Sequence, residues 1–353
     1  MSKQFVKLAG LCALGAWCTA VGAAEDMGNM TQEEHLKMMK NLPTTTATSE
    51  HAHHQHGAGS WMFEYRYMRM NQQDLMNGTA ATTADKVLNQ GYMMAAESMK
   101  MDMHMLMGMY GINDKLSMML GLNYISNDMD MVNADTTTMP GMTMAGKHSM
   151  MEVHGIGDTE VTAMYKYNPH ITMSMGVSLP TGSTDEHDHR ADGSTSHGHA
   201  PYYMQPGSGT LDFKPAATMQ FDLGAYNVGA QGSFTYRPGY NATHYNLGNR
   251  LDGSTWVKYN AIPHLQLSAG LAGHFLSKVK AESGSHMLEM VSMMPDYDPN
   301  NTGSLRIEAV FGVEGVYKNF KAGLEYGLPV YERMRGIQLE TRNVIGVALA
   351  AMF

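Results

Sequence analysis

Lys100-Met-Asp-Met-His-Met-Leu-Met-Gly-Met-Tyr110 carries a methionine at every second position. Successive side chains of a β-strand point to opposite faces, so a strand would gather the five thioethers on one face and Asp102, His104 and Tyr110 on the other. A helix would scatter the same methionines around its whole axis. The spacing therefore predicts a strand with two different faces.

The same alternation recurs along most of the chain. In the first such segment, Trp61, Phe63 and Tyr65 share one face while Glu64 and Arg66 share the other. Twelve segments of this kind follow one another, with short turns alternating with long loops. This rhythm predicts an all-β fold, a 12-stranded antiparallel transmembrane β-barrel with a disordered N-terminal tail. A soluble β-sandwich is the alternative, but it would need a second sheet to cover the outward aromatic residues.

Two stretches of the expected barrel look like long loops, residues 71–99 and the segment from the end of the third strand to about Gly155. The last strand ends at Phe353, and a terminal aromatic residue resembles the assembly signal of outer-membrane barrels. Its predicted inner face is small or apolar, and carries Val344, Gly346, Ala348, Ala350 and Met352.

The N-terminus is typical of a secretory signal. Residues 1–24 hold basic residues, an apolar run and a small-residue end, so we expect cleavage after Ala24. Both cysteines lie inside this segment, which leaves the mature chain without thiolate sites. Residues 25–59 lack the apolar content for a core, and we expect a disordered, periplasmic, Met- and His-rich tail. The barrel is predicted over 60–353.

Charge excludes one class of partner. The chain has 24 basic and 33 acidic residues, and removal of the two leader lysines leaves 22 − 33 = −11. A nucleic-acid partner would need a basic face, so none is expected. No later segment has the length of apolar sequence that a membrane-spanning helix requires. The unusual numbers are 37 methionines and 17 histidines.

Six phrases of the sequence carry a resemblance to a known family. They are Trp61-Met-Phe-Glu-Tyr-Arg-Tyr-Met-Arg-Met70, Met101-Asp-Met-His-Met105, Gly176-Val-Ser-Leu-Pro-Thr-Gly182, Gln205-Pro-Gly-Ser-Gly-Thr-Leu-Asp212, Glu325-Tyr-Gly-Leu-Pro-Val-Tyr331 and Gln338-Leu-Glu340. They resemble the meta-pathway phenol-degradation family of outer-membrane channels, in a methionine-rich branch. The resemblance covers about 60–353 and implies a barrel channel or transporter. The departures are a histidine-rich loop at 187–199 and the histidine-rich tail.

Methionine and histidine cluster in ways that suit soft metals. Thioether sulfur is a ligand for Cu(I), and imidazole suits Cu(II), zinc and nickel. No cofactor is required, but Cu(I), Cu(II) or Ag(I) is a candidate bound or transported ion. The candidate ligands are Met101, Met103, Met105, Met107 and Met109 on the predicted strand, Met129, Met131, Met142, Met144, His148 and His154 in the following loop, His51, His53, His54 and His56 in the tail, and His187, His189, His197 and His199 in a later loop.

Each cluster also has a plain structural interpretation. The five strand methionines either bind metal or pack a plug in the lumen, because methionine is a flexible apolar filler. Met118, Met173 and Met175 fall on outer faces, where lipid contact is expected. The predicted inner faces carry charges of both signs, including Glu64, Arg66, Glu160, Lys166, Asp212, Lys214, Arg306, Glu308, Glu314, Lys321 and Glu325. They form either a wet pore or a lumen closed by ion pairs.

The sequence thus favours a channel or transporter in the bacterial outer membrane, linked to copper or other soft-metal handling. A channel for hydrophobic or aromatic compounds is the alternative, and a structural or adhesive barrel is a third. Enzyme activity is not expected, because no nucleophile elbow is present. Outer-membrane lipid and a metal ion or small molecule are the expected partners. The oligomeric state stays open.

Overall fold

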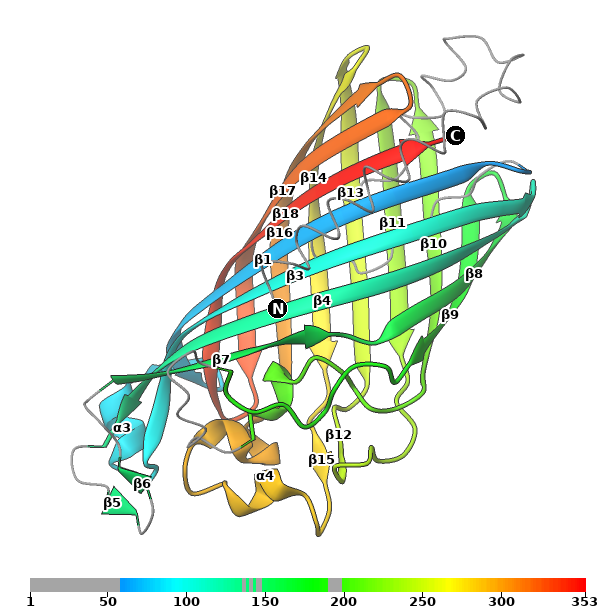
Figure 1. Ribbon diagram of the computed structural model, residues 1–353. Helices are drawn as coiled ribbons and strands as arrows, with labels where there is room; N and C mark the ends of the chain where they lie inside the picture. The colour runs from blue at the N-terminus through cyan, green and yellow to red at the C-terminus, as the bar shows by residue number, and fades with distance from the viewer. Residues whose placement is uncertain (1–57, 135–137, 140–141, 144–147, 190–198) are drawn as a thin grey trace.

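The computed structural model describes residues 58–134, 138–139, 142–143, 148–189 and 199–353. Twelve antiparallel strands close into a barrel in which the last strand pairs with the first (Figure 1), so the predicted fold is confirmed. The barrel strands are β1 (Trp61–Asn77), β3 (Met94–Asn113), β4 (Leu116–Asn133), β8 (Thr159–Asn168), β9 (Ile171–Leu179), β10 (Asp212–Leu223), β11 (Tyr226–Thr235), β13 (Arg250–Ile262), β14 (Leu265–Leu276), β16 (Ser304–Tyr317), β17 (Phe320–Met334) and β18 (Ile337–Met352).

Short elements gather at the end of the barrel opposite the C-terminus (Figure 1), and we call this the loop end. Strand β7 lengthens the sheet there by pairing with the C-terminal half of β4, from Tyr124 to Val132. No helix within the described residues is long and apolar enough to span a membrane. The elements outside the barrel are β2 (Ala80–Thr82), α3 (Ala84–Leu88), β5 (Thr138–Met139), β6 (Met142–Thr143), β7 (His148–Ile156), η1 (Tyr202–Met204), β12 (Tyr245–Asn246), β15 (Lys280–Ala281), α4 (His286–Glu289), η2 (Pro295–Tyr297) and η3 (Pro299–Asn301).

The outer face of the barrel is apolar. Leu271 is 54% exposed and Val330 is 58% exposed, and Met173 and Met175 point outward as predicted. Such a band flanked by aromatic girdles is what a transmembrane barrel presents to lipid. Exposed aromatic side chains lie near both strand ends, with Tyr167, Phe221, Tyr226, Tyr259, Tyr317 and Phe320 at the short-turn end and Phe213, Phe234, Phe275 and Tyr331 towards the loop end.

The first and last strands close the barrel. The Trp61 N–H donates to the Phe353 carbonyl at 2.9 Å, and the Phe353 N–H donates to the Trp61 carbonyl at 2.8 Å. Pairing continues along both strands as far as Asn77 and Ile337. Closure leaves no unpaired sheet edge in the barrel wall, which is the requirement for a sheet in lipid.

A tight turn joins β17 to β18 at the loop end. Gly336 has a φ of +72°, and a Cβ there would lie 2.1 Å from the Asn301 side-chain oxygen. The turn therefore depends on glycine both for its backbone conformation and for space.

The two predicted loops at 71–99 and 125–155 are wrong in extent, because β1, β3, β4 and β7 run through much of them. A strand needs about 9–11 residues to cross a bilayer, whereas β3 has 20 residues. Its excess length lies beyond the apolar band, where polar side chains can face outward. Arg69 and Asp102 show this on the outer face, with Nη2 and Oδ2 only 2.7 Å apart. Because polar residues such as these face outward beyond the apolar band, the sequence there lacks the apolar outer face by which a membrane strand is recognised.

The long loops pack together over the loop end through a core that we call the loop-end cluster. Methionine fits such irregular spaces because its unbranched side chain adapts to the shape around it. Tyr202, Tyr245 and Tyr297 are fully buried there. The buried methionines of the loop-end cluster are Met94, Met99, Met129, Met131, Met151, Met204, Met287, Met293 and Met294.

Candidate functional site: the barrel lumen

The inner face of the barrel divides into two walls. We call the inward-facing residues of strands β8 to β17 the charged wall, and those of β18, β1, β3 and β4 the methionine wall. Because neighbouring strands follow one another in chain order around the barrel, each wall is a continuous surface.

Ion pairs line the charged wall. The Glu314 carboxylate lies 2.9 Å from Lys321 Nζ and 3.8 Å from Lys258 Nζ, and all three side chains are buried. A buried charge needs a partner, since the desolvation cost of an isolated one is large. The inner charges thus pair with one another along this wall, and these pairs do not by themselves close the lumen. Further pairs join Glu160 to Lys214, Asp212 to Arg237, Asp252 to Arg250 and Glu308 to Arg306.

The methionine wall contains the predicted stripe. Leu106 and Tyr110 are 38% and 36% exposed on the outside, whereas Met109 is 1% exposed on the inside, so the inward orientation is confirmed. In the β1–β3 register, Met103 lies opposite Met68 and Met101 opposite Met70. The exception on this wall is the buried Glu64–Arg66 pair, whose atoms lie 2.7 Å apart.

The part of the stripe nearest the short β3–β4 turn packs into a second apolar cluster, the turn-end cluster. Met107 and Met109 meet methionines from three other strands there. This agrees with the packing interpretation of those two residues. Metal binding by the stripe stays a prediction. The members of the turn-end cluster are Met62, Met107, Met109, Met119 and Met164, with Ala350 packed against them.

The predicted loop ligands are mostly not in a loop. Met129 and Met131 lie on β4 with buried side chains, and His148 and His154 lie on β7. The prediction that these four residues lie in a loop is therefore wrong, while metal binding by them stays a prediction. Only the backbone of Met142 is described, in β6, and Met144 falls outside the described residues.

The candidate ligand histidines that the structure describes lie beside carboxylates or beside one another. His199 Nδ1 is 2.5 Å from Asp185 Oδ1, and His189 Nε2 is 2.7 Å from Glu186 Oε2. The rings of His187 and His199 lie 4.2 Å apart between centroids. Within the described part of the chain, no group of three His, Cys, Asp or Glu residues is placed to hold a metal ion. His51, His53, His54, His56 and His197 fall outside that part, and all these ligand assignments stay predictions.

One carboxyl group lies inside the loop-end cluster. The Tyr203 hydroxyl donates to Asp296 and also lies 3.6 Å from the Met129 sulfur. Burial raises the pKa of Asp296 to about 6 and the pKa of Tyr202 to about 12. Burial and the nearby Asp296 likewise raise the pKa of Tyr203. The cluster is thus dry enough to disfavour a charge.

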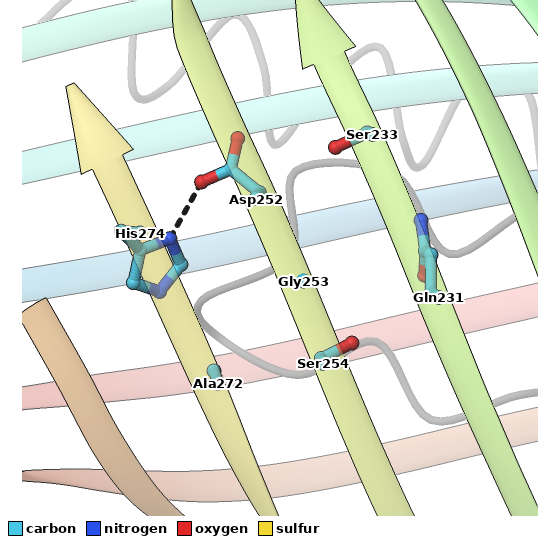
Figure 2. A pocket seen from close by; sticks show the side chains of 7 residues that line it. All are labelled: Gln231, Ser233, Asp252, Gly253, Ser254, Ala272 and His274. Atoms are coloured by element: carbon cyan, nitrogen blue, oxygen red, sulfur yellow. Dashed lines mark hydrogen bonds and ion pairs between the residues drawn. The ribbon is translucent and has the colours of Figure 1, made fainter. Parts of the chain in front are cut away.

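A small hollow interrupts the charged wall between β11, β13 and β14 (Figure 2). His274 and Asp252 face each other from neighbouring strands, with Nδ1 2.6 Å from Oδ1. The sequence placed His274 on the inner face, and the structure agrees. Ser254 and Trp256 were not assigned to the inner face from the sequence, although their alternation with Lys258 indicates it. The hollow is lined by Gln231, Ser233, Asp252, Gly253, Ser254, Ala272 and His274.

Solved structures that are similar to this chain include outer-membrane channels. An outer membrane channel from Pseudomonas putida F1 has a TM-score of 0.55 at 10% identity, covering 84% of this chain and 97% of that chain. This likeness shows the fold. The P. putida toluene transporter TodX has a TM-score of 0.42 at 8% identity, covering 84% of this chain and 90% of that chain. No curated protein matches the chain.

A family model also matches. The model described as "Putative MetA-pathway of phenol degradation" covers residues 121–290, from the middle of β4 to the loop after β14. The methionine-rich branch within the family stays a prediction. The match confirms the resemblance that the sequence motifs carry. Through residues 121–290, this protein is related to the family of the meta-pathway of phenol degradation.

Proposed function

We propose that this protein is an outer-membrane channel for small, largely apolar molecules, aromatic compounds among them. The observation that carries the proposal is the methionine wall, which offers a largely apolar surface along one side of the lumen, interrupted by the Glu64–Arg66 pair. The family match and the fold shared with an outer membrane channel support it. This function replaces metal handling as the first candidate.

The chemistry of the methionine wall suits aromatic solutes. A thioether sulfur near an aromatic ring contributes about 0.3–1.5 kcal/mol, and a row of flexible side chains can adapt to rings of different shape. The charged wall opposite is already neutralised by its own ion pairs. An apolar molecule that follows the methionine wall therefore need not strip water from unpaired charges.

The test is uptake by whole cells. Lipopolysaccharide slows entry of apolar molecules, so initial uptake of radiolabelled toluene would be measured in a Gram-negative host with and without the protein. We expect a severalfold increase. Replacing Met101, Met103 and Met105 together by glutamine should abolish it, whereas leucine at the same positions should keep most of it. Uptake equal to that of the empty host, with folded barrel present, contradicts the proposal.

A second candidate is capture or passage of Cu(I) or Ag(I). It is favoured by the stripe facing the lumen, with Met68 and Met70 alongside Met103 and Met101. The test is Cu(I) and Ag(I) binding to the refolded barrel beside a variant with leucine at all five stripe positions. Loss of stoichiometric binding in the variant supports a luminal metal site, while no binding in either protein removes this candidate.

The proposal includes location and processing. We infer that residues 1–24 are a leader removed near Ala24, that the barrel sits in outer-membrane lipid, and that the protein acts as a channel rather than as an enzyme. The exposed apolar band and aromatic residues support the lipid contact. The measurement is the intact mass of the protein recovered from the outer-membrane fraction. An unprocessed mass, or recovery elsewhere, contradicts this part.

A further inference from the structure

Arg306 reaches from the charged wall to the methionine wall. Its Nη1 donates to Thr341 Oγ1 on β18 at 3.1 Å and to Met70 Sδ on β1 at 3.3 Å. Strands β17 and β18 lie between β16 and β1 in the barrel (Figure 1). Neighbouring strands are about 4.8 Å apart, so the two side chains bridge three strand spacings and meet inside the lumen.

The guanidinium is held firmly at its charged-wall end. Arg306 Nε forms an ion pair with Glu308, whose side chain is 0% exposed. The strand register places Arg306 directly opposite Glu332. Glu332 accepts from the Thr341 N–H at 2.8 Å and from the Thr341 hydroxyl at 3.0 Å, which leaves the hydroxyl oxygen to accept from Arg306. The planar fork of the arginine is therefore fixed in direction.

The contact with Met70 is the weak part of this bridge. A thioether sulfur is a weak hydrogen-bond acceptor, and the unbranched methionine side chain has three rotatable bonds. The ion pair between Arg306 and Glu308 is the stronger interaction, because both groups are charged. A molecule that pushes between the two walls would thus displace Met70 and leave Arg306 in place.

The bridge borders the loop-end cluster. Thr341 is two residues from Leu339, a member of the cluster, and Met70 lies opposite Met101, which packs against the cluster. Glu308 and Thr341 are 0% and 2% exposed, so water does not reach the inner face here. The surface around Arg306 is therefore covered by side chains rather than by water.

We propose that Arg306 is a selectivity residue of this channel, and that its contact with Met70 closes the lumen to water and ions beside the loop-end cluster. An apolar molecule passes by pushing the flexible Met70 side chain off the guanidinium. A hydrated ion would have to lose its water to enter the same gap, at a large cost. The inference rests on the proposed function and adds the residue that separates apolar solutes from ions.

Ion conductance of the purified protein in planar lipid bilayers tests the closure without any apolar solute. R306Q/E308Q removes the bridge and both charges of the pair together, so neither partner is left unpaired. M70A removes the other end of the bridge with no change of charge, and M70L keeps an apolar side chain of similar volume there. The matched control is R250Q/D252N, because Arg250 Nε pairs with Asp252 Oδ1 at 2.8 Å, two residues along one strand, as Arg306 does with Glu308.

We expect a low conductance for the wild-type protein and a severalfold rise in both R306Q/E308Q and M70A. M70L and R250Q/D252N should stay close to the wild type. Far-ultraviolet circular dichroism of each preparation shows whether the barrel is folded. M70A changes one neutral side chain, so it keeps the test valid if R306Q/E308Q does not fold.

An unchanged conductance in folded M70A, or an equal rise in R250Q/D252N, overturns the inference. A wild-type conductance as high as that of the variants does the same. The channel proposal fails separately, by unchanged toluene uptake in cells. A rise in conductance without toluene uptake would keep the closure and remove the apolar solute, whereas uptake with unchanged conductance in M70A would keep the channel and remove the role of Arg306.

Discussion

The charged wall and the methionine wall line the same lumen but are specified in different ways. Several carboxylates of the charged wall lie beside a particular cation, as Glu314 does with Lys321 and Glu160 with Lys214. The methionine wall has no such pairing, apart from Glu64 and Arg66. Its methionines share only size, flexibility and apolar character.

This difference teaches where the sequence is free to vary. A buried ion pair fails when one partner is lost, because the other charge is left in a poor solvent. A methionine replaced by another unbranched or γ-branched apolar residue leaves nothing unpaired. We therefore expect the charged wall to be fragile towards single substitutions and the methionine wall to tolerate them.

Glu314→Gln should have the largest effect. Lys258, which is 1% exposed, and Lys321 would lose the carboxylate that both approach, at an expected cost of about 3–5 kcal/mol in the free energy of unfolding. Urea unfolding of the barrel refolded into lipid vesicles measures it. Asp114→Asn, in the exposed β3–β4 turn, is the matched control with one charge removed. Equal stability of the two variants would contradict the comparison.

Asp296 sharpens the comparison because it is a carboxyl group placed among methionines and tyrosines. Its pKa is raised from 3.8 to about 6, which corresponds to about 3 kcal/mol. The folded state therefore binds the proton more tightly. Protonation of Asp296 therefore stabilises the folded state, and this stabilisation is fully present below pH 4 and is lost as the pH rises through 6.

The loop-end cluster should accordingly open more readily at pH 7 than at pH 4. Amide hydrogen exchange in the loops, corrected for the intrinsic rate at each pH, measures the opening. Asp296→Asn keeps the shape without the charge and should flatten the dependence between these two values. A pH dependence that persists in this variant would assign the effect to another group.

Gly336→Ala probes the turn that joins the two walls. The φ of +72° and the nearby Asn301 oxygen leave no room for a methyl group, so we expect a loss of about 1–3 kcal/mol. Gly224→Ala is the control, since it has a similar φ of +71° but open space around it. A larger loss at Gly336 than at Gly224 isolates the steric part, and equal losses would mean that backbone strain alone acts.

Met107→Leu should have the smallest effect. Both side chains are apolar and similar in volume, so the free energy of unfolding should change by less than about 1.5 kcal/mol, despite the burial of Met107 in the turn-end cluster. Met107→Gln, which introduces an amide of similar length, is the comparison and should cost more. If leucine costs as much as glutamine, the methionine wall is as specific as the charged wall.

The number of strands and the facing of their side chains were predictable, because alternation with a period of two is a local property of the chain. Leu106 and Met107 could be assigned to opposite faces from neighbouring residues alone. The extent of the strands was not predictable in the same way. Beyond the apolar band, Asp102 and Asp128 point outward, and the chain then resembles a polar loop although it remains strand.

The site was only partly predictable for a different reason. The inner position of Glu314 followed from alternation, but its partners Lys258 and Lys321 lie on other strands, and this pairing depends on the register. The hollow depends on small residues meeting across three strands, as Ser233, Gly253 and Ala272 do. The methionines of the loop-end cluster could not be separated from ligands, because a thioether serves both packing and coordination.

The hydrogen bonds between Trp61 and Phe353 have a consequence for how the protein is made. The two strands that close the barrel are its first and its last, so every earlier stage of folding is an open sheet with two adhesive edges. The edges can join only after nearly the whole chain has been delivered. Premature contact of either edge with another molecule would give aggregates, and loss of the final residues should trap the protein before insertion.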